Sequence, residues 1–286
     1  MVYFFWGSTY LAIRIGVETG SGFPPFILGA LRTLVGGSIL LLWCVLRKNR
    51  LRLSGRQTLH LAISGILLWV GGNGLVNWAE QHADSGYSAL LVGALPIWMA
   101  IMEAVLDRRR PTLPLIIGIL TGFIGLIVLT FPVIQHGNSH DWWAVVGLLL
   151  APLFWGAGSL VYQRNPTNLP AVASAAYQQL FGGVGFAIVS FATHEPMLHP
   201  TPHAWFAWAY LVVAGSLFAF TAFLTALQLL PISLVATYAY VNPVIAVFLG
   251  WLFLNEPVTG YTFAGTGLIM VGVFGVFRAK HRIKVN

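Results

Sequence analysis

The sequence predicts an all-α integral membrane protein with ten transmembrane helices in two inverted five-helix repeats and both termini in the cytoplasm. Three observations lead to this fold class. The composition is too apolar for a soluble domain, the basic residues gather in alternate loops, and the second half of the chain repeats the first.

The composition places the chain in a lipid bilayer. Of its 286 residues, 57% are hydrophobic and 8% are charged, and the mean hydropathy is +0.79. A soluble domain carries roughly a quarter charged residues. A helix that crosses a bilayer needs about 20 mostly apolar residues. The sequence offers ten such stretches: 1–17, 24–46, 58–79, 85–106, 113–133, 142–162, 170–192, 204–228, 233–253 and 260–278.

The basic residues predict how these helices are oriented. Thirteen of the 15 Lys and Arg residues follow even-numbered stretches, and the loops on the opposite side contain none. Because short loops rich in Lys and Arg stay in the cytoplasm, both termini are predicted to be cytoplasmic. The net charge of +7 then reflects topology and contact with anionic lipid, and we expect no nucleic acid partner.

The second half of the chain aligns with the first at a shift of about 147 residues. Three pairs of features then coincide: Pro96 with Pro243, "FWG" at 5–7 with "FWG" at 154–156, and "LVGG" at 34–37 with "LFGG" at 180–183. The predicted repeats are 1–133 and 142–278, and chance similarity between apolar segments is the alternative. Two halves with five spans each must insert in opposite orientations, as in many secondary transporters.

The matched prolines predict interrupted helices in the fourth and ninth spans. Pro96 and Pro243 each remove a backbone donor, and Asn242 adds a buried amide beside the second. In inverted-repeat transporters such interruptions line a wet cavity near the substrate. The alternative is a packed proline kink whose amide bonds to a neighbouring helix.

These features resemble a known family. The segment "ALQLLPISLVATYAYVNPVIAVFLGWLFLNEPVTGYTFAGTGLIMVGVF" at 226–274 is similar to an EamA domain, the repeat unit of the drug/metabolite transporter superfamily. The first half matches it with "FWGSTYLAIR" and the segment from Pro96 to Gly125. Within the superfamily, the chain looks most like the YddG-type exporters of aromatic amino acids. One departure is that Arg109 and Arg110 stand where the second half has Glu256 and Pro257.

Polar and aromatic side chains within the spans are candidates for a binding cavity. Trp6 and Trp155 are repeat mates, each followed by a glycine that lets a neighbouring helix approach. Pairs of polar residues four apart share one helix face. The candidate substrate-binding residues are Trp6, Tyr10, Asn73, Asn77, Trp98, Trp155, Tyr238 and Asn242. Interhelical packing and hydrogen bonding are the alternative roles for all of them.

Charged residues inside the spans are functional candidates by default. Arg14 and Glu18 are four apart and can pair, and with Arg32 they are predicted to form a gate near the outer face. Snorkelling to the interface is the alternative. Glu103 is the only carboxylate placed within a span, one turn before a cytoplasmic basic cluster.

The resulting prediction is a bacterial inner-membrane transporter that exports small metabolites. We expect amino acids, aromatic ones included, moved by alternating access without energy coupling. Alternatives are proton-coupled export of organic cations, drugs or other metabolites, an intramembrane enzyme, or a channel. No paired acid and base, Ser-His set or metal triad lies within the spans, so no enzyme activity, metal or cofactor is expected. We expect a monomer rather than a dimer.

Overall fold

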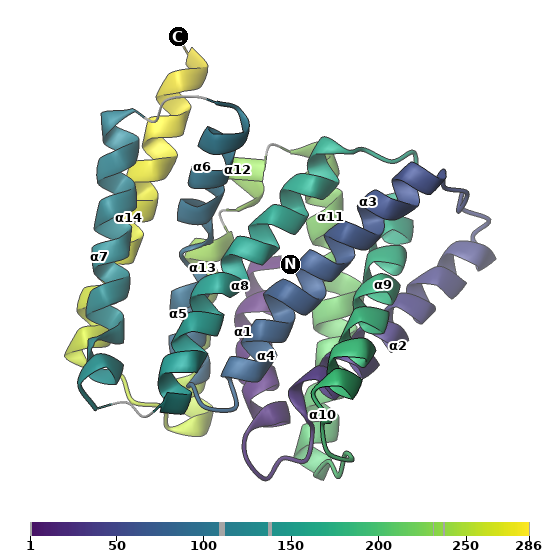
Figure 1. Ribbon diagram of the computed structural model, residues 1–286, viewed down its shortest axis with the longest axis horizontal. Coiled ribbons are helices and arrows are strands. Elements are labelled where there is room, and N and C mark those ends of the chain that lie inside the picture. The colour runs from purple at the N-terminus through teal and green to yellow at the C-terminus, as the bar shows by residue number, and fades with distance from the viewer. Residues whose placement is uncertain (1, 109–111, 137–138, 231, 237, 286) are drawn as a thin grey trace.

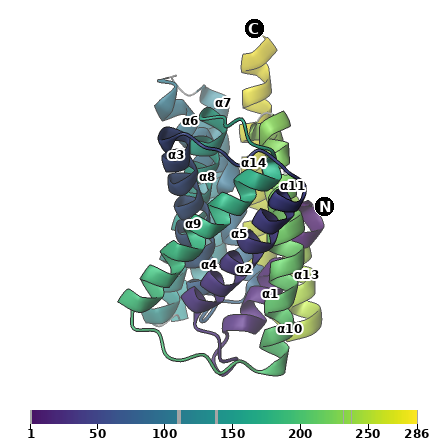
Figure 2. The same cartoon turned by 90° about the vertical axis from the view of Figure 1, so that its right-hand side faces the viewer.

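The computed structural model describes residues 2–108, 112–136, 139–230, 232–236 and 238–285, and within these ranges it contains helices and no strand. The chain forms one bundle (Figures 1 and 2). Its elements are α1 (Val2–Val17), α2 (Pro25–Leu46), α3 (Gly55–Ile66), the π-helix η1 (Leu67–Asn73), α4 (Gly74–Ala79), α5 (Ser85–Val92), α6 (Leu95–Leu106), α7 (Leu113–His136), α8 (Ser139–Arg164), α9 (Ala171–Ala192), α10 (Pro202–Tyr210), the π-helix η2 (Leu211–Ala219), α11 (Phe220–Leu229), α12 (Ile232–Val235), α13 (Tyr238–Leu254) and α14 (Gly260–Val285).

The helices suit a bilayer in length and in surface. Seven helical segments of the described chain are long and apolar enough to cross a membrane, and two shorter apolar helices accompany them, Val241–Leu254 and Gly260–Val276. Large apolar side chains such as Phe191 and Phe206 are more than three-quarters exposed. In water such a surface would be unfavourable, whereas lipid solvates it.

The two ends of the bundle differ in charge. We define the basic end as the end that carries the loop 47–54 and the C-terminus, and the acidic end as the end that carries the loops 18–24, 80–84, 193–201 and 255–259. In Figure 1 the basic end is uppermost, and the N-terminus lies partway along the bundle.

Left-handed residues end four helices at matching positions of the two halves. Lys48 follows α2 and His194 follows α9, while Arg108 follows α6 and Asn255 follows α13, all with φ between 50° and 54°. This conformation is uncommon outside glycine and typically closes a helix C-terminus. Each pair is separated by about the offset that aligns the two halves of the sequence.

The packing of one half is mirrored in the other. The pairs α2–α9 and α7–α14 each bring a helix against its counterpart. α1 packs against α13 and η2, and its counterpart α8 packs against α5, α6 and η1. The main contacts made by the first half with the second therefore have equivalents made in the opposite sense.

Matched glycine motifs allow these close approaches. A Cβ added to Gly183 would lie 2.6 Å from Leu34 Cγ, and one added to Gly37 would lie 3.0 Å from Leu180 Cγ, so "LVGG" packs on "LFGG". The α7–α14 pair is tighter, because a Cβ on Gly118 would lie 2.8 Å from the backbone nitrogen of Val276. These small residues are used for packing within the chain.

The helix interruptions match the sequence expectation in only one half. α5 ends at Val92 and α6 begins at Leu95, with Pro96 in its first turn, where a proline is well tolerated. Pro243, in contrast, lies inside α13, which runs unbroken from Tyr238. The interruption expected at Pro243 itself is therefore wrong. The ninth span is divided earlier instead, because α12 ends at Val235 and α13 begins at Tyr238, so Pro243 falls in the second turn of the new helix.

Candidate functional site

A small cavity lies inside the bundle, between helices of both halves. Its volume is about 60 Å³, which is room for a few water molecules. The walls come from α1, α2, η1, α4, α5 and α6 of the first half and from α8 and α13 of the second. Six of the eight residues predicted to bind substrate line it: Trp6, Tyr10, Asn73, Trp155, Tyr238 and Asn242.

Arg32 of α2 is the charged residue of the cavity wall. Its Nε donates to Ser216 Oγ at 3.0 Å, and its Nη1 donates to Asn73 Oδ1 at 3.2 Å. The guanidinium carbon lies 5.1 Å from the centre of the Trp69 ring, in a cation–π arrangement. Only 2% of the side chain surface is exposed. The structure thus places Arg32 in the cavity and not in the predicted gate near the outer face, because it lies two turns inside α2.

The guanidinium of Arg32 has only neutral partners in the part of the chain that the structure describes. Ser216 and Asn73 supply hydroxyl and amide oxygens, and no carboxylate lies within ion-pair distance. A buried charge without a counter-ion is costly, because hydrogen bonds to neutral groups replace only part of its hydration. The cavity is therefore chemically suited to receive an anionic group.

Two π-helical segments position the partners of Arg32. η1 carries Trp69 and Asn73, and η2 carries Ser216. A π-helix is wider than an α-helix, and such segments are frequent at functional sites. The two segments occupy corresponding places, in the third span of the first half and the eighth span of the chain. The sequence reasoning missed them, since neither contains a proline.

Aromatic rings form the rest of the cavity wall. Trp6 and Trp155 meet edge to face with ring centres 5.3 Å apart, and Tyr238 meets Trp6 at 4.9 Å. The indole nitrogens of Trp69 and Trp155 are buried and have no hydrogen-bond partner among the described residues. These two N–H groups are donors that water or a ligand in the cavity can use.

Two of the predicted binding residues lie elsewhere. Asn77 is fully buried and donates to the backbone carbonyl of Pro25 at 3.2 Å, which ties α4 to the start of α2. Trp98 packs edge to face against Phe123 of α7, with ring centres 5.7 Å apart. Neither residue lines the cavity. Asn77 lies one helical turn beyond Asn73, toward the acidic end, and Trp98 faces α7.

Asn242 serves both the cavity and the packing. With its amide nitrogen turned toward them, it donates to the backbone carbonyls of Tyr238 at 3.1 Å and Tyr3 at 3.0 Å. The first bond lies within α13, next to the position where Pro243 provides no amide donor. The second joins α13 to α1. The polar residue in the apolar run is thus satisfied by backbone acceptors.

The predicted gate is arranged differently from the expected Arg14–Glu18 pair. Arg14 donates to the backbone carbonyl of Glu80 across the acidic end, from α1 to the end of α4. Within the described residues, Arg14 and Glu18 form no ion pair. Glu80, which follows the last residue of α4, is fully buried.

Two carboxylates from the second half cap the N-termini of helices of the first half. Glu195 accepts from the amides of Phe26 and Ile27 at the start of α2, both at 2.9 Å. Glu256 accepts from the amides of Ser85 at 2.7 Å and Gly86 at 2.9 Å, at the start of α5. Anions are favourable at helix N-termini. Arg109 aligns with Glu256 in the first half, and Arg110 aligns with Pro257. Both arginines lie outside the described residues.

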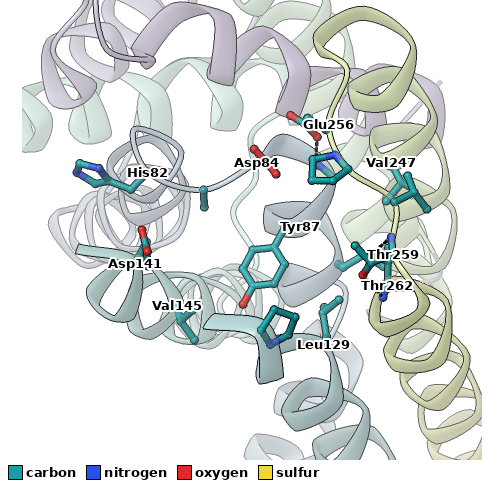
Figure 3. Close-up of a pocket in the computed structure, with 17 residues that line it drawn as sticks. His82, Asp84, Tyr87, Leu129, Asp141, Val145, Val247, Glu256, Thr259 and Thr262 are labelled. Atoms are coloured by element: carbon teal, nitrogen blue, oxygen red, sulfur yellow. Dashed lines mark hydrogen bonds between the residues drawn. The ribbon is translucent and has the colours of Figure 1, made fainter. Parts of the chain in front are cut away.

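A second cavity of about 220 Å³ opens beside Glu256 at the acidic end. Figure 3 shows the carboxylates of Asp84 and Glu256 next to one another on its wall, with Tyr87 pointing along it. Asp141 and His82 lie on the opposite side of the view. The loops of both halves therefore meet around an acidic vestibule.

Comparison with known proteins identifies the family. The sequence profile of the EamA-like transporter family matches residues 1–131 and, again, residues 142–278. The chain belongs to the EamA-like transporter family. It is a multi-pass protein of the bacterial inner membrane and a transporter rather than an enzyme.

Relatives of this EamA protein are transporters whose substrates are not named. The "uncharacterized inner membrane transporter YedA" of Escherichia coli K12 is 32% identical over 98% of this chain and 89% of its own length. The "uncharacterized transporter YoaV" of Bacillus subtilis is 23% identical over 94% of this chain and 91% of its own. A crystal structure of a protein 20% identical superposes with a TM-score of 0.68 over 96% of this chain and 94% of that one, which shows a common fold.

Proposed function

We propose that this EamA protein exports amino acids, aromatic ones included, by alternating access to the central cavity. In this proposal the chain forms ten spans in two inverted repeats, and the basic end with both chain termini faces the cytoplasm. The observation that carries the substrate class is Arg32, a buried cation in the cavity wall that has only neutral partners among the described residues.

A carboxylate is the group that best completes this site. A guanidinium presents its donors in a planar fork that matches the two oxygens of a carboxylate. Ser216 and Asn73 hold Nε and Nη1, and Nη2 has no hydrogen-bond partner among the described residues. A substrate carboxylate would therefore replace hydration that the buried guanidinium has lost.

The remaining groups of an amino acid also find complementary surfaces. Tyr10, Tyr238 and Asn242 line the cavity with hydroxyl and amide groups. The faces of Trp6 and Trp155 can hold an ammonium group by cation–π attraction or stack on an aromatic side chain. A zwitterion with an apolar side chain fits this combination better than a dication or a sugar.

The cavity is too small for such a substrate in this structure. A volume of about 60 Å³ is far below the several hundred cubic ångströms of an ordinary ligand pocket. Transport therefore requires the walls to separate toward one end of the bundle at a time. The interfaces between halves, α1–α13 and α8–α5/α6, are where the two repeats can rock against one another.

Counterflow in proteoliposomes tests the proposal. Vesicles loaded with unlabelled phenylalanine should take up labelled phenylalanine, whereas phenethylamine, which lacks the carboxylate, should neither be taken up nor compete. Empty vesicles are the control for leakage. Equal exchange of the amine would contradict the amino acid assignment and favour an exporter of organic cations. Flux of label that does not depend on internal substrate would indicate a channel.

A further inference from the structure

Glu80 is a buried carboxylate without a hydrogen-bond partner. It follows α4 at the acidic end, none of its surface is exposed, and neither carboxylate oxygen has a partner among the described residues. The hydroxyls of Ser85 and Ser88 on α5 are buried and unpartnered as well. An ionised carboxylate in such a place lacks both water and donors, so its neutral form is favoured.

The charged and titratable groups near Glu80 come from the helices packed against α4 and from the adjoining loops. α1 brings Arg14, which binds the backbone carbonyl of Glu80, and Tyr10 one turn away. Asp84 precedes α5, and Glu256 comes from the loop between α13 and α14. The charged residue of α2 is Arg32, in the central cavity.

α8, the remaining neighbour of α4, brings Asp141 to the acidic end. The charge of Asp141 acts on the hydroxyl of Tyr87 across the vestibule shown in Figure 3. Glu256 accepts hydrogen bonds from two backbone amides, and its charge disfavours a second negative charge at Glu80. Arg14 is the nearby cation that partly offsets this repulsion.

These surroundings determine the direction in which the pKa of Glu80 shifts. Burial, and next the charge of Glu256, raise the pKa of Glu80 well above its ordinary range, while Arg14 and the nearby Ser88 act in the opposite sense. Burial and Glu256 also raise the pKa of Asp84. The closed arrangement therefore binds a proton more tightly than an open, hydrated one would. Low pH favours closure, and closure is lost as pH rises through the raised pKa.

The position of Glu80 links it to access to the cavity. Tyr10 and Asn73 line the cavity, and one or two turns further along the same helices lie Arg14 and Glu80. The Arg14–Glu80 contact and the Glu256 cap thus join α1, α4, α5 and the second half across the space between the cavity and the acidic end.

We propose that Glu80 is a proton-binding site that must be occupied for the acidic end to close. When that end opens, water hydrates the carboxylate and the proton leaves to the same side from which it came. External pH then sets how often the cavity opens outward, while no proton crosses the membrane. The proposal requires alternating access only and does not depend on which substrate the cavity binds.

Accessibility of the cavity to a membrane-impermeant maleimide tests this site without any substrate. The reporter is Ile13→Cys, at a buried position of the cavity wall, in a Cys44→Ala background. Thr19→Cys, in the exposed loop at the acidic end, corrects for the pH dependence of the thiol itself. The ratio of the two labelling rates should rise with external pH between about pH 5 and pH 9, by up to roughly tenfold per unit for one proton.

Variants assign the effect to Glu80. Glu80→Gln should keep the ratio low at every pH, and Glu18→Gln, at the same end but outside the cluster, should retain the rise. Arg14→Gln removes the offsetting cation, so the rise should move to higher pH. A wild-type ratio that does not change with pH, or a rise that persists in Glu80→Gln, would overturn the proposal. If Glu80→Gln does not insert, an unchanged midpoint in Arg14→Gln overturns it instead.

Discussion

Arg32 Nε donates to Ser216 Oγ at 3.0 Å, and this bond joins α2 of the first half to η2 of the second across 184 residues of sequence. The opposite edge of the same guanidinium binds Asn73 of η1. One buried cation is thus held between the two π-helical segments. Any motion that separates the halves must break or rotate the Arg32–Ser216 bond, so the charge that suits a substrate carboxylate also reports on the packing of the halves.

Substitution of Arg32 should remove recognition of the carboxylate. Hydrogen bonds to a charged group contribute about 1.5–3 kcal/mol, so we expect Arg32→Gln to lower kcat/KM for phenylalanine counterflow by roughly tenfold to a hundredfold. Arg32→Lys should restore little, because an ammonium cannot form the planar fork. Ser216→Ala, which keeps the Arg32 cation, should lower the same kcat/KM by roughly threefold. Normal transport by purified, folded Arg32→Gln protein would rule out this role.

The two classes of tryptophan should separate in a transport assay. Trp155 meets Trp6 edge to face in the cavity, whereas Trp98 meets Phe123 outside it. Trp155→Ala should reduce counterflow of phenylalanine more than that of alanine, because the lost ring contacts an aromatic side chain. Trp98→Ala should leave the transport rate per folded molecule unchanged and lower the midpoint of thermal unfolding in detergent. Equal transport losses in both variants would contradict the assignment.

The sequence predicted the fold from properties that do not depend on tertiary detail. Apolar length identifies spans, and a repeated motif such as "FWG" places Trp6 near Trp155 because equivalent segments of two halves meet at the pseudo-symmetry axis. Gly7 of that motif lets α13 approach α1, since a Cβ on Gly7 would lie 2.7 Å from Ile245 Cβ. Trp6 and Trp155 both line the cavity.

The remaining site features depend on contacts between distant segments. Arg32 was placed at the outer face because the sequence does not show that η1 and η2 bring Asn73 and Ser216 to its side chain. Trp98 was placed inside because a helix face cannot be assigned to a neighbour from sequence. Glu80 follows a span and so resembles a loop residue. Its burial depends on segments far apart in the sequence, because Arg14 of α1 binds its backbone carbonyl and α8 packs against α4.

The glycines of α14 should respond to substitution according to the face they occupy. A Cβ on Gly272 would lie 2.7 Å from the carbonyl oxygen of Gly118, whereas nothing lies within 4 Å of one on Gly267. Gly272→Ala should therefore destabilise the fold by about 1–3 kcal/mol, and Gly267→Ala should stabilise it by up to about 1 kcal/mol. Thermal unfolding in detergent measures both. Equal shifts in the two variants would show that the α7–α14 seam is not closely packed.

Orientation can be decided with two neutral positions in a Cys44→Ala background. Thr19 lies in a loop at the acidic end, and Asn49 lies in a loop at the basic end. An impermeant maleimide added to intact cells should label Thr19→Cys within minutes and should label Asn49→Cys only after the membrane is permeabilised. The excess of Lys and Arg at the basic end is the physical reason. The reverse pattern would invert the proposed topology.

Transport of a zwitterion through this cavity should be uncoupled from ion gradients. The described residues that line the cavity include no carboxylate and no histidine, and an arginine stays protonated at any useful pH. Glu80 lies at the acidic end, outside the cavity wall, so in our proposal it exchanges its proton with one side only. A gradient of one pH unit would support roughly tenfold accumulation if one proton moved with each substrate. We therefore expect phenylalanine in proteoliposomes to reach, and not exceed, the external concentration under an imposed pH gradient or a membrane potential. The initial rate should nevertheless change with pH on the acidic-end side.

A proton-coupled transporter reconstituted in the same way is the positive control, and it must accumulate its substrate under the same pH gradient. Accumulation of phenylalanine by this chain under either gradient would contradict uncoupled transport.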